Sequence, residues 1–300
     1  MIQARRIGHA VFETKDLDRL CEHYTDVVGL MVAARDKDRV FLASRMGNLA
    51  VELRNGSDTG CRKLSFEVAP DTDLGDAAKE LTKLGIRSER SNDPAPGLTN
   101  VLTFTDPKGT QVEIFTGWSA HANGGPTKGI PVTKLGHVAY FTSDLQKTID
   151  FYANVLGFRI SDWIGDYFVF MRCNPDHHTV NFFRDEQTRM HHIAFELADW
   201  NQMKTACDIL ARRAINIAWG PVRHGPGHNI SIYYRETDDQ LVELFCDLDR
   251  MPDEELGYFE PRPWHRDNPQ RPKVWEPGPT SNIWGLPPGP DFLRGRQSTT

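Results

Sequence analysis

The sequence predicts an α+β fold made of four βαβββ modules, arranged as two pseudo-repeated domains. Motifs of the first half return in the second half at an offset that drifts only from 128 to 130 residues, as expected for one duplicated fold. The length of 300 residues and the hydrophobic content of 39% also suit about two globular domains. The repeated pairs are Ile7-Gly8-His9 with Leu135-Gly136-His137, Tyr24 with Tyr152, Ser65-Phe66-Glu67-Val68 with Ala194-Phe195-Glu196-Leu197, and Val112-Glu113-Ile114-Phe115 with Val242-Glu243-Leu244-Phe245.

The first half begins with a β-rich segment at 6–13 and an amphipathic helix at 16–28. Asp16 is the expected N-cap of this helix, and Gly29 is expected to end it. The apolar residues at helical spacing are Leu17, Leu20, Tyr24 and Val27. The remaining elements are expected as strands at 30–33, 39–43, 49–54, 62–68, 100–105 and 111–115 and as a helix at 74–84.

The second half repeats this plan and is followed by a segment of different character. Its strands are expected at 135–141, from 157 to about 184, at 190–197, 229–234 and 240–246, with helices at 144–156 and 200–213. The predicted boundaries are a first domain at 1–118, a Gly- and Pro-rich linker at 119–134, a second domain at 135–249 and an extended tail at 250–300.

The tail is dense in proline and carries three tryptophans, Trp264, Trp275 and Trp284. A disordered tail is the simplest interpretation, but such tails are usually poor in tryptophan. We therefore expect an ordered arm that lies across the mouth of a cavity in the second domain or against a neighbouring subunit. Three of its charged residues would then lie near that cavity: Arg262, His265 and Arg266.

Composition excludes several classes of partner. The net charge of −6 gives no electrostatic basis for binding nucleic acid or an anionic membrane surface. No apolar run approaches the roughly 20 residues of a membrane span, and no apolar segment follows the charged N-terminus. The five cysteines are scattered and form no CxxC motif, which favours reduced thiols in a cytoplasmic protein.

A candidate metal site lies in the second half, which holds seven of the eleven histidines between His137 and His228. His137 and His192 fall on the first strands of the third and fourth modules, and Glu243 falls on the last strand. Two imidazoles and one carboxylate make a facial triad, which leaves open positions on Fe(II). Taken alone, each residue is more often structural. In the first half Lys63 stands where His192 stands in the second, and because an ammonium is a poor ligand, we expect no metal there.

Several segments of the second half resemble the type I extradiol ring-cleavage dioxygenases of the vicinal oxygen chelate superfamily. These segments are Met190-His191-His192-Ile193-Ala194-Phe195, Gly220-Pro221-Val222-Arg223-His224-Gly225, Ile232-Tyr233 and Val242-Glu243-Leu244-Phe245. The resemblance extends over about residues 5–250. It implies the vicinal oxygen chelate fold, with His137, His192 and Glu243 as the ligands of the metal.

The same resemblance assigns further site residues. It implies that His178 is the acid–base histidine beside the oxygen site, that His224 bonds the substrate, and that Tyr233 hydrogen-bonds a substrate oxygen. His228 is a weaker match to a further pocket histidine. Because neighbouring strand residues point to opposite faces, His191 and Tyr234 are expected to point away from the metal. Two pocket residues complete the set: Phe170 as an aromatic wall, and Ala139, which faces the same cavity as His137 and leaves it open.

The reaction implied is extradiol cleavage of a catechol-type substrate by Fe(II) and O2, in aromatic compound degradation, with Mn(II) as the alternative metal. The partners expected are the small-molecule substrate and a second copy of the chain in a homo-oligomer. Two other classes stay open, namely a metal-dependent isomerase or lyase and a non-catalytic ligand-binding protein of the same superfamily. One departure from the resemblance is structural: the hairpin before Glu243 reads Glu236-Thr237-Asp238-Asp239-Gln240, whereas the first half has Asp106-Pro107-Lys108-Gly109.

Overall fold

The computed structural model describes residues 2–119, 128–260, 270–285, 287–289 and 292. The first domain consists of β1 (Ala4–Thr14), α1 (Leu17–Asp26), β2 (Met31–Arg35), β3 (Arg39–Ala43), β4 (Leu49–Asn55), β5 (Gly60–Val68), α2 (Leu74–Lys83), β6 (Ser88–Ala95), β7 (Leu98–Thr105) and β8 (Gln111–Phe115). The second consists of β9 (Lys134–Thr142), α3 (Leu145–Asn154), β10 (Arg159–Ile164), β11 (Phe168–Arg172), β12 (Val180–Arg184), β13 (Arg189–Glu196), α4 (Trp200–Arg212), β14 (Ile217–Arg223), β15 (Ile230–Arg235) and β16 (Leu241–Cys246). The tail adds β17 (Val274–Trp275) and a 3-10 turn, Pro279–Ser281.

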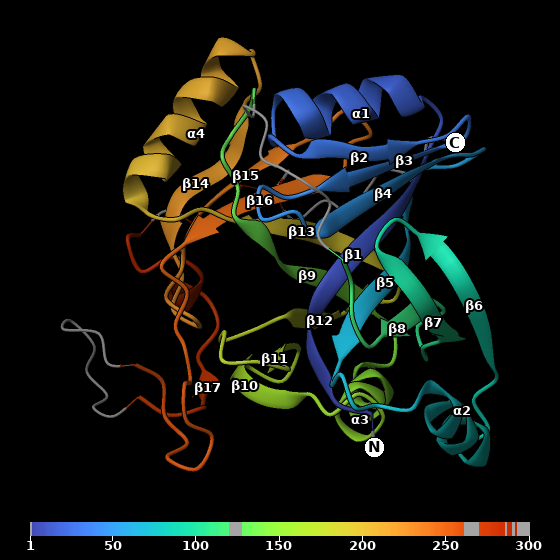
Figure 1. Ribbon diagram of the computed structural model, residues 1–300. Helices are drawn as coiled ribbons and strands as arrows, with labels where there is room; N and C mark the ends of the chain where they lie inside the picture. Colours follow the sequence, from blue (N-terminus) through green and yellow to red (C-terminus); the bar gives the residue numbers. More distant parts are fainter. Residues whose placement is uncertain (1, 120–127, 261–269, 286, 290–291, 293–300) are drawn as a thin grey trace.

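Each domain is one mixed sheet made of two βαβββ modules, which confirms the predicted fold class. The strand order is β2-β3-β4-β1-β5-β8-β7-β6 in the first sheet and β14-β15-β16-β13-β9-β12-β11-β10-β17 in the second. The two modules of a domain join through their first strands, because β1 pairs antiparallel with β5 and β9 with β13. Figure 1 places α1 and α4 at one end of the molecule and α2 and α3 at the other, with the strands between them.

Besides the two-residue β17 of the tail, two strands were missed in the sequence, β6 and β14. Each lies at the outer edge of its sheet and pairs with one neighbour within the described residues. The segment Ser88–Ala95 is mostly polar and exposed, so it lacks the apolar alternation by which a half-buried strand is recognised. An edge strand of this kind depends on its neighbour for its conformation rather than on its own sequence.

The two domains pack on each other through the repeated aromatic residues. Tyr24 of α1 lies with its ring centroid 6.2 Å from that of Phe195 in the second domain. Its counterpart Tyr152 of α3 lies 6.3 Å from Phe66 in the first domain. All four rings belong to one hydrophobic core that spans both sheets. The repeated tyrosines and phenylalanines therefore hold the domains together reciprocally, and they belong to the interface rather than to a site.

The hairpin before β16 differs in sequence from the corresponding hairpin of the first domain, but both contain a carboxylate that accepts hydrogen bonds from the turn. Asp106 Oδ1 accepts hydrogen bonds from the backbone N–H groups two and four residues further on. Glu236 accepts from the corresponding groups through Oε2 at 2.7 Å and Oε1 at 2.8 Å. Asp239 takes the left-handed conformation, with φ +66°, that Gly109 has in the first domain. Burial raises the pKa of Glu236 to about 7. The departure in sequence thus leaves the turn unchanged.

Local signals at the first helix are confirmed. The Asp16 side chain accepts a hydrogen bond from the Arg19 backbone N–H at 3.0 Å, as expected for an N-cap. Gly29 follows the helix with φ +81°, a conformation that favours glycine.

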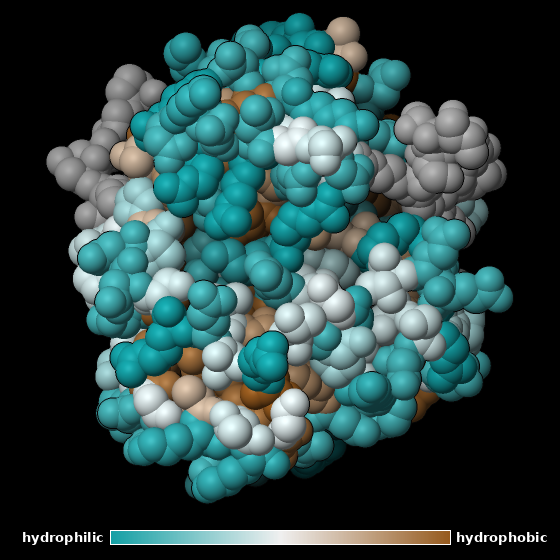
Figure 2. Space-filling view, turned by 90° about the vertical axis from the view of Figure 1, so that its right-hand side faces the viewer, coloured by the Kyte–Doolittle hydropathy of each residue, from teal (hydrophilic) through white to brown (hydrophobic). Residues whose placement is uncertain are grey.

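Hydrophilic residues cover most of the face seen in Figure 2, and hydrophobic atoms appear between them in small patches. Among the described helices, none is both long enough and apolar enough to cross a membrane. All five cysteines lie within the described residues and are free thiols.

The glycine of each repeated Gly-His motif is required by a close ring contact. A Cβ atom added to Gly8 would lie well inside van der Waals contact of the Phe115 ring, and one added to Gly136 would meet the Phe245 ring in the same way. Both phenylalanines are almost fully buried, so neither ring has room to move aside.

We predict that G8A and G136A each lower the free energy of unfolding by about 1–3 kcal/mol, the usual cost of overpacking a core. The control is G117A, because a Cβ atom on the exposed Gly117 meets nothing within 4 Å. It should change stability by less than about 0.5 kcal/mol. Chemical denaturation of the three variants checks this. Equal stabilities in all three would show that the rings do not require the glycines.

Candidate metal centre and active-site cavity

Three neighbouring strands of the second sheet bring His137, His192 and Glu243 together. The register pairs Ala194 of β13 with His137 of β9 on one side and with Glu243 of β16 on the other. His192 lies two residues from Ala194, so its side chain points to the same face. The Nε2 atoms of the two histidines are 3.2 Å apart. Glu243 Oε2 lies 3.0 Å from His137 Nε2 and 3.1 Å from His192 Nε2.

The spacing of these three atoms fits a metal ion. Ligands about 2.1 Å from an octahedral ion lie about 3.0 Å apart when they occupy adjacent positions. Three mutual distances of 3.0–3.2 Å therefore match one triangular face of an octahedron. This group is the one set of candidate metal ligands among the described residues, and all three side chains are buried.

The electrostatics of the triad favour its ligand form. Burial alone would raise the pKa of Glu243, but the adjacent His137 and His192 hold it well below its usual range. Burial also lowers the pKa of His192. An ionised carboxylate and a neutral imidazole are the states that bind a metal.

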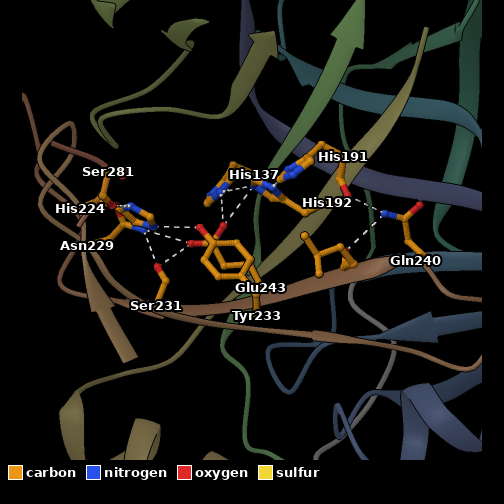
Figure 3. A network of polar contacts seen from close by, with 11 residues as sticks. His137, His191, His192, His224, Asn229, Ser231, Tyr233, Gln240, Glu243 and Ser281 are labelled. Atoms are coloured by element: carbon orange, nitrogen blue, oxygen red, sulfur yellow. Dashed lines mark hydrogen bonds and ion pairs between the residues drawn. The ribbon is translucent and has the colours of Figure 1, made fainter. Parts of the chain in front are cut away.

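Hydrogen bonds orient the ligands from behind (Figure 3). Ser231 donates to Glu243 Oε1 at 2.6 Å, and Asn229 donates to the same oxygen at 3.1 Å. The other oxygen, Oε2, is the one that faces the two histidines. His191 Nδ1 lies 2.7 Å from His192 Nδ1, so the two rings lie side by side and not on opposite faces of the strand. The expectation that His191 points to the other face is wrong, because the register of β13 shifts between Met190 and His192 and interrupts the alternation. Glu243 is therefore arranged to offer one oxygen to a metal.

The first domain has a salt bridge where the second has the triad. Lys63 Nζ lies 2.5 Å from Glu113 Oε2, and Ser65 donates to Glu113 Oε1 at 2.9 Å. His9 Nε2 is 3.7 Å from Glu113 Oε1, and burial lowers the pKa of His9. Glu113 thus has a serine donor and a histidine neighbour, as Glu243 does, although Ser65 stands where Ala194 stands in the second domain and Ser231 comes from β15. The Lys63 ammonium supplies the positive charge that a metal would supply in the second domain.

A cavity of about 450 Å³ opens beside the triad. Its lining is mostly aromatic and includes Phe141, Phe168, Phe170, Phe183, Trp219 and Phe292. Segments of the tail also border it, namely Gly278, Thr280, Ser281, Pro288 and Phe292. The described part of the tail therefore lies at the second-domain cavity, where it was expected. The predicted charged residues Arg262, His265 and Arg266 lie outside the described residues.

His178, His224 and Tyr233 all line this cavity. The ring of His178 lies 4.3 Å from that of His137, and burial lowers the pKa of His178 well below its usual range. His224 Nδ1 lies 2.7 Å from the Ser281 carbonyl oxygen, which only accepts hydrogen bonds, so Nδ1 carries the proton. His224 Nε2 is then the acceptor for the Tyr233 hydroxyl, 2.8 Å away. Tyr234 instead faces the first domain, where its hydroxyl meets His23 at 3.2 Å.

Of the predicted pocket residues, Phe170 lines the cavity, whereas Ala139 and His228 are not part of its described lining. Ala139 is fully buried and pairs in register with Asn181 of β12. The ring of His228 is hydrogen-bonded to Asp249 on the far side of the loop that carries it. The described lining of the cavity therefore does not support the expectation that Ala139 keeps the cavity open.

Asn181 is one of several polar lining residues that were missed in the sequence. Asn181 lines the cavity amid phenylalanines, and its Oδ1 is buried without a hydrogen-bond partner in the described structure. Its position follows from strand alternation, because Phe183, two residues further along β12, lines the cavity too. The two-residue alternation is present in the sequence, but the start of β12 was not predicted.

Comparison with known proteins finds one matching superfamily and several named relatives. The sequence matches the Glyoxalase/Bleomycin resistance protein/Dioxygenase superfamily over residues 6–114 and 134–244. Biphenyl-2,3-diol 1,2-dioxygenase of Paraburkholderia xenovorans (strain LB400) is 30% identical over 261 residues, which cover 80% of this chain and 86% of that protein. Metapyrocatechase of Pseudomonas sp. (strain CF600) is 26% identical over 264 residues, which cover 80% and 85%.

Solved structures share the fold at lower identity. The Mn(II)-bound glyoxalase from Novosphingobium aromaticivorans superposes with a TM-score of 0.86 at 22% identity, covering 99% of this chain and 96% of that one. An extradiol ring-cleaving dioxygenase from B. fuscum superposes with a TM-score of 0.83 at 23% identity, covering 98% and 82%. Both enzymes share the architecture of this chain.

We predict that H192K abolishes metal binding while keeping the protein folded. The lysine would pair with Glu243 as Lys63 pairs with Glu113. H192A should also lose the metal, but it leaves Glu243 buried with one fewer partner and should be less stable than H192K in the metal-free state. Metal analysis and thermal unfolding of the metal-free proteins check this. Full metal occupancy in H192K would exclude His192 as a ligand.

Proposed function

Because the chain belongs to the Glyoxalase/Bleomycin resistance protein/Dioxygenase superfamily, we propose that it is an extradiol dioxygenase. The proposed reaction opens the ring of a catechol-type substrate next to its two hydroxyl groups, with Fe(II) and O2. Fe(II) is favoured over Mn(II) only by the proposed reaction, since the N/O ligand set accepts both metals. Relatives that carry dioxygenase names, such as biphenyl-2,3-diol 1,2-dioxygenase, support this reaction class.

The observation that carries the proposal is the position of the triad at the wall of an aromatic cavity. His137, His192 and Glu243 occupy one face of the metal site, and the cavity lies beside them. Three open positions are enough for the two oxygens of a catechol and for dioxygen. When bound, a divalent metal would lower the pKa of a coordinated hydroxyl and provide a site for dioxygen beside the ring.

Tyr233 and His224 are arranged to hold the substrate. The Ser281 carbonyl oxygen fixes the ring of His224, and His224 Nε2 accepts a hydrogen bond from the Tyr233 hydroxyl. The Tyr233 oxygen then keeps its lone pairs for a substrate hydroxyl. This arrangement binds one catechol oxygen without ionising the tyrosine, whose pKa is raised well above its usual range by burial and by Glu243.

His178 is the proposed proton carrier. Its Nδ1 is engaged by His177 at 3.0 Å, so Nε2 is the ring nitrogen left for the cavity. A histidine there can take a proton from the substrate and return it when the ring opens. The surrounding phenylalanines exclude water from the bound ring.

The test is anaerobic reconstitution with Fe(II), followed by a panel of catechols read by an oxygen electrode and by near-ultraviolet absorbance of the product. Oxygen uptake equal to product formed supports the dioxygenase. Metal binding with turnover but without oxygen uptake indicates an isomerase or lyase. Binding of catechols without turnover or metal indicates a ligand-binding protein.

We predict a preference for catechols with an apolar alkyl or aryl substituent, by at least about tenfold in kcat/KM over a catechol with a carboxylate side chain. The cavity wall is aromatic, and burying an unpaired carboxylate there is costly. Arg184 lies in the described lining, next to Asp185, and is engaged with Asp166 at 3.2 Å. As a matched variant, F170A should lower kcat/KM more for an aryl catechol than for catechol itself. A tenfold preference for the acidic substrate would overturn this.

We predict that H178F slows turnover by about 10² or more, the usual scale for lost acid–base catalysis, while metal content and anaerobic catechol affinity are kept. The comparison variant is Y233F, which should weaken catechol binding and leave the metal in place. Kinetics, metal analysis and anaerobic titration separate the two. If H178F is isolated without metal, His178 is a ligand and not a proton carrier.

A further inference from the structure

A second histidine and a buried carboxylate lie behind His178. His177 Nδ1 is 3.0 Å from His178 Nδ1, and His177 Nε2 is 3.0 Å from Asp162 Oδ2. The side chains of His177 and Asp162 are fully buried. The His177 ring is held between two aromatic rings, with centroids 5.6 Å away at Phe170 and 4.8 Å away at Phe259. The three polar groups therefore form a fixed line that ends at the cavity.

The tail supplies further donors to this carboxylate. The Trp275 indole N–H donates to Asp162 Oδ2 at 2.7 Å, and the Lys273 backbone N–H donates to Oδ1 at 2.8 Å. These residues are placed by β17, which pairs with β10, the strand that carries Asp162. Both oxygens of Asp162 thus receive an N–H donor from the tail, and a carboxylate in its ionised form can only accept hydrogen bonds. His177 must therefore carry its proton on Nε2.

We propose that Asp162 and His177 are positioning residues that fix the tautomer of His178. This inference rests on the proposed function, in which His178 carries the proton. With its proton on Nε2, neutral His177 is an acceptor at Nδ1, so His178 donates from Nδ1. The lone pair of His178 then lies on Nε2, the nitrogen left for the cavity. His178 is thereby set to accept a proton as its first act.

The proton balance follows from this arrangement. A proton leaving a substrate hydroxyl binds to His178 Nε2, and the ring becomes an imidazolium with protons on both nitrogens. The His178 Nδ1–H continues to donate to His177, whose own Nε2–H donates to the Asp162 anion. The negative charge of Asp162 thus stabilises the cation that forms on His178, as the carboxylate does in a Ser-His-Asp triad. Return of the proton from Nε2 to the opening ring restores the starting state.

The experiment compares D162N, H177F and the double variant in the Fe(II)-loaded enzyme. D162N keeps the shape of the side chain and removes its charge. Each single variant should lower kcat by about 10²–10⁴, while metal content and the anaerobic Kd for the catechol change by less than about twofold. Because Asp162 acts only through His177, D162N should change kcat by less than about twofold when it is added to H177F. W275F is the matched control, because it removes one donor to Asp162 and keeps the carboxylate–histidine contact.

A second measurement needs no turnover. Nitrogen-15 NMR of histidine-labelled, Zn(II)-loaded protein reports which ring nitrogen carries the proton, with the His178 signals assigned by their loss in H178F. The expected pattern is a proton on Nδ1 and none on Nε2. A His178 protonated on Nε2, or a His177 protonated on both nitrogens, overturns the proposal. So do effects of D162N and H177F that multiply in the double variant, or a kcat that neither variant lowers.

The two proposals fail in different ways. If the wild-type enzyme turns over no catechol, the proposed function falls, and the tautomer measurement still decides whether Asp162 and His177 set the state of His178. If turnover is normal and the tautomer is the opposite one, the dioxygenase stands and the positioning role falls.

Discussion

The centre of the second domain depends on the register of three adjacent strands. Ala194 is paired in register with both His137 and Glu243, and this fixes the three ligand atoms within 3.2 Å of each other. A one-residue slip of any of these strands would turn its side chain to the opposite face of the sheet. Such precision comes from the many hydrogen bonds of the whole sheet, so a site built on strands is more exact than one built on loops. Gly136, which precedes His137, is needed for the same geometry. Because it has no Cβ atom, it leaves room for the Phe245 ring, whose centroid lies 4.9 Å from that of His137.

In the first domain, the carboxylate that corresponds to Glu243 is neutralised by a lysine. A buried carboxylate left without a partner is costly, so a domain that does not bind a metal must neutralise Glu113 in another way. The Lys63 ammonium does so at 2.5 Å, with Ser65 on the other oxygen. The two domains then share one core through the reciprocal tyrosine and phenylalanine contacts. The first domain thereby packs against the domain that carries the triad.

The tail contacts the residues of the cavity through polar as well as apolar side chains. Ser281 fixes the ring of His224, and Trp275 and Lys273 bind the carboxylate behind His178. Phe292 adds to the aromatic wall beside Tyr233, with ring centroids 4.8 Å apart. A segment without a long helix or strand of its own can thus be held in place by the residues it helps to orient.

The sequence by itself determined the repeat, the fold class and the two histidines and glutamate of the triad. These features follow from local period, from spacing and from residue chemistry, which need no three-dimensional information. Strand alternation also separated Tyr233 from Tyr234. It did not separate His192 from His191, because the register of β13 shifts between Met190 and His192 and both histidines line the cavity. The edge strands β6 and β14 could not be recognised, because their conformation is imposed by a neighbouring strand. Asp162, His177 and Trp275 lie up to 113 residues apart and meet only when β17 is added to β10. Their association was decided by the tertiary structure, since a buried carboxylate takes whichever N–H donors the folded chain brings within 3 Å of it.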